Sequence, residues 1–210
     1  MAKDTKHQLY KAATRLGNSF RFANLKLDKP YTGAEHSFRV AILAMLIVDD
    51  YNNLNPKTPI NVEEVLRKAL IHDLEESKLG DIPTPVKNRS AQFKEAYMAL
   101  GKEIMKDEIV AGSPNEELYL KLWVEDKKGL TGEVIKVADA LEALSTAHYE
   151  IRRGNLSIKR AFLNLKASVQ TPEMMALFEK FPYAKSFCDK HTWFPKHIEK
   201  LLLESDDHDF

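Results

Sequence analysis

The stretch ALIHDLEESKLGDIPTPVK, residues 69–87, places the adjacent pair His72 and Asp73 directly after an apolar run. An imidazole nitrogen and a carboxylate oxygen are both suitable ligands for a divalent metal ion. Neighbouring side chains on a helix point about 100° apart, so one ion can bind both only if other segments complete its coordination. The stretch therefore predicts a metal site that takes further ligands from elsewhere in the chain.

A histidine at the start of a second predicted helix is one candidate. His36 lies in TGAEHSFRV, residues 32–40, where Thr32 and Glu35 have the spacing of a capping box. Apolar residues at i+4, i+7 and i+11 from His36 place it on the inward face of a helix that runs to about residue 50. A lone inward histidine is more often a hydrogen-bonded core residue, but the histidine-aspartate pair favours a ligand.

Asp139 is the other candidate, in the apolar run EVIKVADALEAL, residues 133–144. A carboxylate there is costly to bury unless it is paired or bound to a metal. The alternative to a metal ligand is an ion pair with a basic residue such as Lys136 on the neighbouring turn.

Helical spacing of apolar residues recurs along the chain, and no β-rich block interrupts it. With 210 residues and 44% hydrophobic content, we expect an all-α fold with one domain over residues 1–204 and an acidic mobile tail at 205–210. Helices are predicted at 4–16, 32–50, 61–73, 91–110, 116–126 and 133–152, with one or two short helices in the region from residue 167 onward. In the helix at 91–110, the predicted inward residues are Phe93, Tyr97, Leu100, Ile104 and Met105.

Charge and composition argue against several partners. The 31 basic and 31 acidic residues balance, so no overall field favours nucleic acid or a membrane. The charged N-terminus does not resemble a signal peptide, and no apolar run approaches the roughly 20 residues of a membrane span. Cys188 alone excludes an internal disulfide and fits a cytoplasmic location; pairing between chains through Cys188 stays open.

Three acidic residues follow the pair His72 and Asp73. Glu76 lies four residues after His72 and is expected to face the site, whereas Glu75 is expected to point to solvent or to a salt bridge. Asp81 precedes two prolines that fix the backbone, which suits either the wall of a pocket or an ordinary turn.

The four predicted ligands, His36, His72, Asp73 and Asp139, could hold one divalent ion, whether Co, Mn, Zn, Ni, Fe or Mg. Such an ion would activate water and polarise a phosphoryl oxygen, with Glu76 handling a proton. Arg21, between two phenylalanines, is either a surface residue or a ligand for phosphate.

These residues resemble the HD-domain metal-dependent phosphohydrolases, and more narrowly the bacterial 5'-deoxynucleotidase branch. The resemblance covers about residues 8–165 and rests on RF at Arg21 and Phe22, AEHS at His36, HDLEESKLGDIPTPVK and KVADALEAL. It implies an HD-domain helical bundle whose metal site, between helices, is formed by the same two histidines and two aspartates.

The resemblance also implies roles around the phosphate. It places Glu76 and Asp81 near the scissile phosphate, Arg21 on the phosphate, and Phe22 and Thr84 among the substrate-binding residues. The family commonly has tryptophan where this chain has Phe22.

The resemblance favours a cytoplasmic homodimer that removes the 5'-phosphate from deoxynucleoside monophosphates. The alternatives are a dNTP phosphohydrolase or triphosphohydrolase, similar to phage dATPases, and a non-catalytic nucleotide-binding HD module. Cyclic phosphodiester cleavage is disfavoured because no second histidine set lies near His72. The C-terminal aromatics Phe187, Trp193 and Phe194 are expected to pack or to form an oligomer surface, and His191 and His197 to be structural.

Overall fold

The structure, a computed structural model, describes residues 7–204. The predicted tail at 205–210 and the predicted start of the first helix at residue 4 lie outside these residues. Over the described range every regular element is helical, and the sole β-type pairing is an isolated bridge between Phe20 and Thr32. The elements are α1 (Gln8–Leu16), α2 (Gly33–Leu54), α3 (Val62–Ile71), α4 (Glu76–Leu79), α5 (Thr84–Lys87), α6 (Ala91–Ile104), the π-helical turn η1 (Met105–Ile109), α7 (Glu116–Val124), α8 (Gly129–Arg152), the 3-10 turn η2 (Leu156–Ile158), α9 (Lys159–Val169), α10 (Pro172–Lys180), α11 (Pro182–Thr192) and α12 (Lys196–Glu204).

Local sequence signals fix where the site-bearing helices begin. The Thr32 side chain accepts a hydrogen bond from the Glu35 backbone, and the Glu35 side chain accepts one from the Thr32 backbone, so the capping box that opens α2 is confirmed. The Asn61 side chain caps α3 by accepting from the Glu64 backbone. Helix α3 ends at Ile71, two residues before the predicted end, and His72 is its C-cap.

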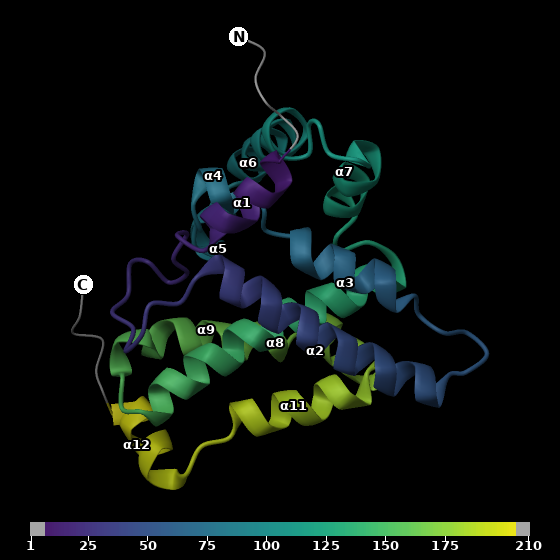
Figure 1. Cartoon of the computed structure of the whole chain (residues 1–210). Helices are drawn as coiled ribbons and strands as arrows, with labels where there is room; N and C mark the ends of the chain where they lie inside the picture. Colours follow the sequence, from purple (N-terminus) through teal and green to yellow (C-terminus); the bar gives the residue numbers. More distant parts are fainter. Residues whose placement is uncertain (1–6, 205–210) are drawn as a thin grey trace.

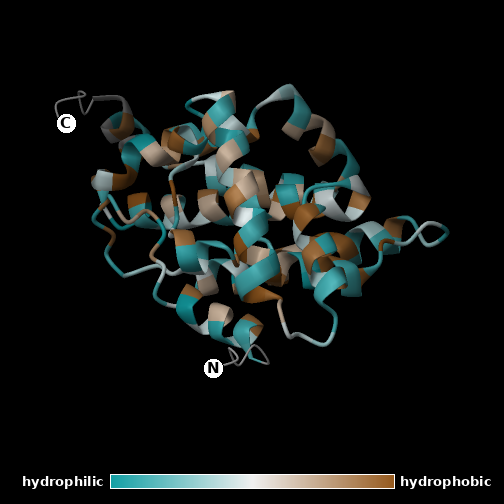
Figure 2. Ribbon diagram, turned by 90° about the horizontal axis from the view of Figure 1, so that it is seen from above, coloured by the Kyte–Doolittle hydropathy of each residue, from teal (hydrophilic) through white to brown (hydrophobic). Residues whose placement is uncertain are grey.

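The larger of two hydrophobic cores is built around α2 and α8, which lie across one another at the centre of the bundle (Figure 1). Val40 and Ile47 of α2 and Leu141 and Leu144 of α8 are fully buried in it. Helices α3, α9, α10 and α11 add their apolar faces. Along the outer helices, apolar and polar residues alternate (Figure 2), as expected of helices that bury one face.

A smaller core joins α1, η1 and α7 above the end of α3 (Figure 1). Met105 and Ile109 of η1 are fully buried there, and Trp123 of α7 is nearly so. Ile71 and Leu74, which flank His72 and Asp73, belong to this smaller core, whereas most of α3 belongs to the larger one. The turn after α3 therefore lies where the two cores meet.

The helix predicted at 91–110 needs correction. The α-helix gives way at Met105 to a π-helical turn, and Phe93 and Leu100 are 41% and 45% exposed, so their predicted inward placement is wrong. Tyr97, by contrast, is buried. Tyr97 and Gly101 are the buried residues of α6, so only a narrow face of this helix is covered.

The C-terminal part of the chain is more helical than predicted. Three helices, α10, α11 and α12, occupy the region for which one or two were expected, and α9 was not predicted at all. Phe194 packs in the larger core, while Trp193 is 65% exposed. Within residues 7–204, none of the helices combines the length and the apolar character that a membrane crossing requires.

Candidate functional site

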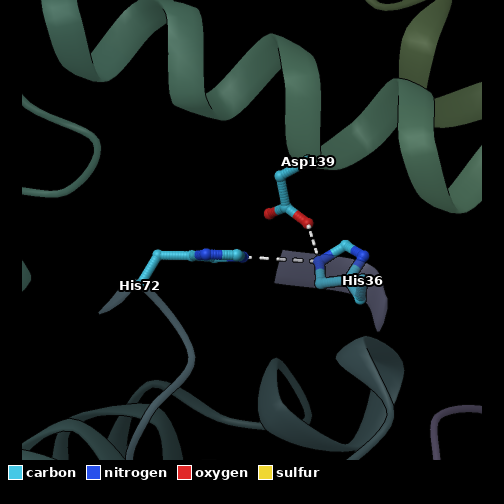
Figure 3. A group of neighbouring side chains, drawn as sticks. All are labelled: His36, His72 and Asp139. Atoms are coloured by element: carbon cyan, nitrogen blue, oxygen red, sulfur yellow. Dashed lines mark hydrogen bonds and ion pairs between the residues drawn. The ribbon is translucent and has the colours of Figure 1, made fainter. Parts of the chain in front are cut away.

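Three segments distant in sequence bring His36, His72 and Asp139 together (Figure 3). His36 lies in the first turn of α2, His72 at the end of α3 and Asp139 in the middle of α8. One ligand atom from each falls within 4.8 Å of the others. The Nε2 atom of His36 is 3.3 Å from Nε2 of His72 and 3.2 Å from Oδ1 of Asp139.

The hydrogen bonds on the far side of each imidazole decide what these Nε2 atoms can do. Nδ1 of His72 donates to the Ala69 carbonyl at 2.7 Å, and Nδ1 of His36 donates to the Glu142 carboxylate at 2.6 Å. A neutral histidine that donates from Nδ1 keeps a lone pair on Nε2. When both imidazoles are neutral, their two Nε2 lone pairs point to one place beside a carboxylate. A divalent cation satisfies this arrangement, so the donor set fits a metal ion.

Asp73 reaches the same point from the residue after His72. Its Oδ2 is 3.2 Å from Nε2 of His72 and 3.6 Å from Nε2 of His36. The same oxygen accepts a hydrogen bond from Nη1 of Arg21 at 2.9 Å. Burial alone would raise the pKa of Asp73, but His72 and Arg21 outweigh it and hold that pKa well below its usual range.

Asp139 also forms the kind of ion pair that was the alternative to a metal ligand, but with a different partner. Its Oδ2 is 3.0 Å from Nζ of Lys127, whereas Lys136 pairs with Glu173 on α10. The Lys136 alternative is therefore wrong. Because Lys127 occupies Oδ2, the other oxygen stays directed at His36. Lys127 and His36 together overcome burial and keep the pKa of Asp139 well below normal.

A second group of carboxylates, on Asp73, Glu75 and Glu76, adjoins the first, with atoms within 4.8 Å of one another. Glu76 is 2% exposed, and its Oε1 accepts a hydrogen bond from Nζ of Lys87 at 2.7 Å. Burial and the charge of Asp73 raise the pKa of Glu76 to about 8, against the effect of Lys87. Such a carboxyl can exchange a proton near neutral pH.

The prediction for Glu75 is wrong: its side chain is buried and, among residues 7–204, forms no salt bridge. Its Oε2 accepts a hydrogen bond from Nε1 of Trp123 on α7 at 2.8 Å. The helical phase used for the prediction does not continue, because α3 ends at Ile71 and a turn precedes α4. Burial, reinforced by the charge of Asp73, raises the pKa of Glu75 to about 7.

Arg21 lies over the junction of the two groups. Its Nη1 contacts Asp73 and is 3.6 Å from Oε2 of Glu76. Neither Nε of Arg21 nor Oε2 of Glu76 has a hydrogen-bond partner among the residues the structure describes, although both are buried. Buried polar atoms without partners are costly, so these two are free to bind a ligand.

Phe22 adopts a left-handed backbone conformation, with φ of 52°, which costs a non-glycine residue about 1–3 kcal/mol. Its ring stacks on that of Tyr31, with centroids 6.5 Å apart, and the backbone of Arg21 donates to the Tyr31 carbonyl. These contacts hold the backbone of Arg21 and Phe22 against Tyr31.

The structure gives less support to the two remaining predicted site residues, Asp81 and Thr84. Asp81, half-buried after Gly80, is near enough that its charge acts on Arg21 and Glu76, but within residues 7–204 its side chain forms no hydrogen bond. Thr84 is exposed in the first turn of α5. Their roles, like those of the four predicted metal ligands, stay predictions.

Sequence reasoning missed Glu142, Tyr31, Lys87 and Lys127. Glu142 had a usable signal, because it lies three residues after Asp139 and so shares its helix face. It binds Nδ1 of His36 and also accepts hydrogen bonds from the Tyr31 hydroxyl and, at 3.0 Å, from Thr146. Tyr31 and Lys127 precede helices and carry no periodic signal.

The chain is similar to known proteins in sequence and in fold. The sequence matches the family described as "5'-deoxynucleotidase YfbR-like" over residues 8–187. It is 30% identical to 5'-deoxynucleotidase YfbR of Salmonella arizonae over 158 residues, which cover 69% of this chain and 76% of that protein.

Two solved structures share the fold. An HD-domain phosphohydrolase from Listeria innocua is 22% identical, with a TM-score of 0.71 over 95% of this chain and 90% of that one. The HD phosphohydrolase DatZ of cyanophage S-2L, solved with dA and one catalytic Zn²⁺ ion, is 18% identical, with a TM-score of 0.55 over 87% of this chain and 95% of that one.

These findings confirm the predicted all-α HD fold and the predicted class of enzyme, a divalent-metal-dependent phosphohydrolase that acts on nucleotides. The chain belongs to the YfbR-like 5'-deoxynucleotidase family.

Proposed function

We propose that this protein hydrolyses deoxynucleoside 5'-monophosphates to a nucleoside and inorganic phosphate. The observation that carries the proposal is the pair of facing histidine Nε2 atoms beside Asp139, with Arg21 and Glu76 at their edge. Family membership supports the reaction, and the bound dA and Zn²⁺ in the cyanophage structure are consistent with it.

In this proposal His36, His72, Asp73 and Asp139 hold the metal. A divalent ion there would polarise a phosphoryl oxygen and lower the pKa of a water molecule. Glu142 and the Ala69 carbonyl keep the two imidazoles in the binding tautomer through their Nδ1 atoms.

Arg21 and Glu76 act on the substrate itself. The Arg21 guanidinium binds a phosphate oxygen, for which its unpartnered Nε is available. Glu76 accepts a proton from the attacking water as the bond between phosphorus and the 5' oxygen breaks. Lys87 holds the other oxygen of Glu76 at 2.7 Å and so orients it.

The remaining predicted substrate contacts complete the proposal. Glu76 then passes the proton that it took from the water to the departing 5' oxygen, and Asp81, on the Glu76 side of the site, assists this transfer near the scissile phosphate. Phe22 contacts the sugar or base from its position beside Arg21. Thr84 contacts the substrate from the exposed first turn of α5.

A substrate panel tests this choice against the triphosphate alternative. Purified protein with added Mn²⁺ or Co²⁺ is assayed on matched sets of dNMPs and dNTPs, with phosphate, pyrophosphate and tripolyphosphate measured separately. We expect phosphate release from dNMPs and none with a chelator. Release of tripolyphosphate or pyrophosphate from dNTPs without action on dNMPs would overturn the proposal.

We also propose that the protein is a homodimer. Phe38, Ile42 and Leu46 lie at i, i+4 and i+8 on α2 and are 62%, 41% and 38% exposed, which makes one continuous apolar stripe. Such a stripe on a soluble enzyme is typical of a protein contact surface.

Light scattering after size-exclusion chromatography tests the dimer. Ile42→Glu should convert a dimer to a monomer, whereas Leu163→Glu, at a similarly exposed leucine on α9 (41%), should not. A wild-type protein that elutes as a monomer, or an Ile42→Glu variant that stays dimeric, contradicts this assignment.

A cytoplasmic location is the last part of the proposal. Its support is the nucleotide substrate of the family and the single cysteine, Cys188, which is buried. Fractionation of cells that express the tagged protein should recover it with cytoplasmic markers; recovery with periplasmic or membrane markers would contradict it.

A further inference from the structure

A cavity of about 620 Å³ lies between the segment at residues 27–31, the C-terminal half of α8 and the end of α11. In Figure 1 the loop after α1 descends to this end of α8, where Asn155 donates a hydrogen bond to the Lys26 carbonyl. Cavities of roughly 300–1,000 Å³ are the usual size for small-molecule sites. No predicted catalytic or metal-binding residue lines this cavity.

The cavity is on the opposite side of His36 from the metal-binding atoms. Its wall includes Tyr31 and Thr146, both of which donate hydrogen bonds to Glu142. Glu142 in turn binds Nδ1 of His36, while Nε2 of His36 faces His72. Tyr31 and Glu142 therefore separate the cavity from the metal-binding site.

The wall of this cavity carries an excess of positive charge, although the chain as a whole is neutral. Five lining residues are cations and only Glu35 and Glu150 are acidic; the cations are Lys29, Arg39, Arg152, Arg153 and Lys190. Two acidic residues offset only part of this charge, and the Glu150 carboxylate is turned toward the Asp28 backbone and Asn155, from which it accepts hydrogen bonds.

Two of the five cations are paired. Arg39 lies 3.6 Å from Glu35, and Arg153 donates to Asp28 at 2.9 Å. The other three, Lys29, Arg152 and Lys190, form no ion pair with any of the residues between 7 and 204. Three cations without ion pairs outnumber the one remaining carboxylate of the wall, Glu150, and this net positive charge attracts a multivalent anion.

An exposed ring extends the same wall. Tyr149 lines the cavity and is 55% exposed, and the Arg153 guanidinium lies 5.5 Å from its ring centre. Arginine over an aromatic ring is a surface on which a planar organic group can stack. The size of the cavity leaves room for such a group beside a phosphate chain.

We propose that this cavity binds a polyphosphate that carries a planar organic group, as a nucleoside triphosphate does. Lys29, Arg152 and Lys190 contact the phosphates, and Tyr149 contacts the organic group. The site is separate from the one that hydrolyses substrate, and its existence does not depend on which phosphate ester that site cleaves.

Calorimetric titration with a chelator present tests this site without hydrolysis. The probes are inorganic tripolyphosphate and a nucleoside triphosphate with a non-hydrolysable imido bridge. We expect both to bind the full-length protein, the nucleotide more tightly. The double variant Arg152→Ala with Lys190→Ala should weaken both at least tenfold, since each lost contact to phosphate is charge-assisted.

The matched control removes the same charge elsewhere. Lys94→Ala with Lys102→Ala, both on α6 at the other end of the molecule (Figure 1), should leave both affinities unchanged. Equal weakening by the two double variants would show an unspecific effect of net charge and would overturn the site. So would unchanged binding in the cavity variant, because the anions would then bind at the Arg21 site.

Two further measurements test whether the variants fold and whether Tyr149 contacts the organic group. All of the substituted side chains are exposed, so thermal melts of the ligand-free variants should match the wild type. Tyr149→Ala should weaken the nucleotide analogue and spare tripolyphosphate. Equal affinity of the wild type for both probes would contradict the role of Tyr149.

Discussion

The two groups of titratable side chains at the site differ in what holds them. His36, His72 and Asp139 are fixed by α2, α3 and α8 of the larger core, and each imidazole is locked through its Nδ1 atom. The other group lies in the turn between α3 and α4 and at the start of α4, around Glu76. Its charge is balanced by Arg21 from the loop after α1 and by Lys87 from the short helix α5. The metal-binding side chains are therefore held rigidly, whereas the charge balance around Glu76 depends on cations from separate segments. A metal site needs the first property and a proton-transfer site the second.

Removing a metal-ligating side chain should have the largest effect on metal affinity and activity. Asp139→Asn deletes a carboxylate charge between His36 and Lys127. We expect metal affinity and hydrolysis to fall by more than the ~10- to 100-fold that loss of an outer hydrogen-bond partner costs. Calorimetric titration with Mn²⁺ measures the metal affinity, and steady-state assays measure the hydrolysis. Full activity at the wild-type metal concentration would contradict the role of Asp139 as a metal ligand.

Glu76→Gln should lower catalysis without lowering metal affinity. It removes the proton-transferring carboxyl while keeping the shape that contacts Lys87, so kcat should fall ~10²- to 10⁴-fold with metal affinity preserved. Glu103→Gln, on the exposed part of α6, is the control. If Glu76→Gln abolishes metal binding together with kcat, Glu76 belongs to the coordination group.

Glu142→Gln tests the hydrogen bond that holds Nδ1 of His36. The substitution weakens the acceptor of the Nδ1 proton, so metal affinity should fall ~10- to 100-fold. The exposed Glu95→Gln on α6 serves as the matched control. A variant with wild-type metal affinity would show that the tautomer of His36 needs no carboxylate partner.

Trp123→Phe should have the smallest effect on catalysis and a clear effect on stability. It leaves buried Glu75 without its donor, which costs ~1–3 kcal/mol. Glu75→Gln keeps an acceptor and should destabilise less. Thermal melts with metal titrations check both variants; a large loss of metal affinity in Trp123→Phe would place Glu75 in the metal site.

The sequence could predict the coordination group better than the electrostatic one, for a physical reason. The helix caps at Thr32 and Asn61 and the inward stripe of α2 are local patterns, and they set the direction of His36 and the start of α3. The same reasoning failed for Glu75, because the turn after Ile71 breaks the helical phase.

Residues outside periodic segments could not be predicted at all. The left-handed backbone of Phe22 and the contacts of Lys87 and Lys127 depend on how distant segments pack. Phe93 and Leu100 were misplaced because apolar spacing alone does not say how much of a helix face its neighbours cover. The predicted single domain and tail boundaries stay predictions.

Anomalous X-ray diffraction from crystals soaked in Mn²⁺ tests the central claim most directly. We predict one ion bound by Nε2 of His36, Nε2 of His72 and the carboxylates of Asp73 and Asp139. An ion held instead by the carboxylates of Glu75 and Glu76, or no ion at His36, would contradict it.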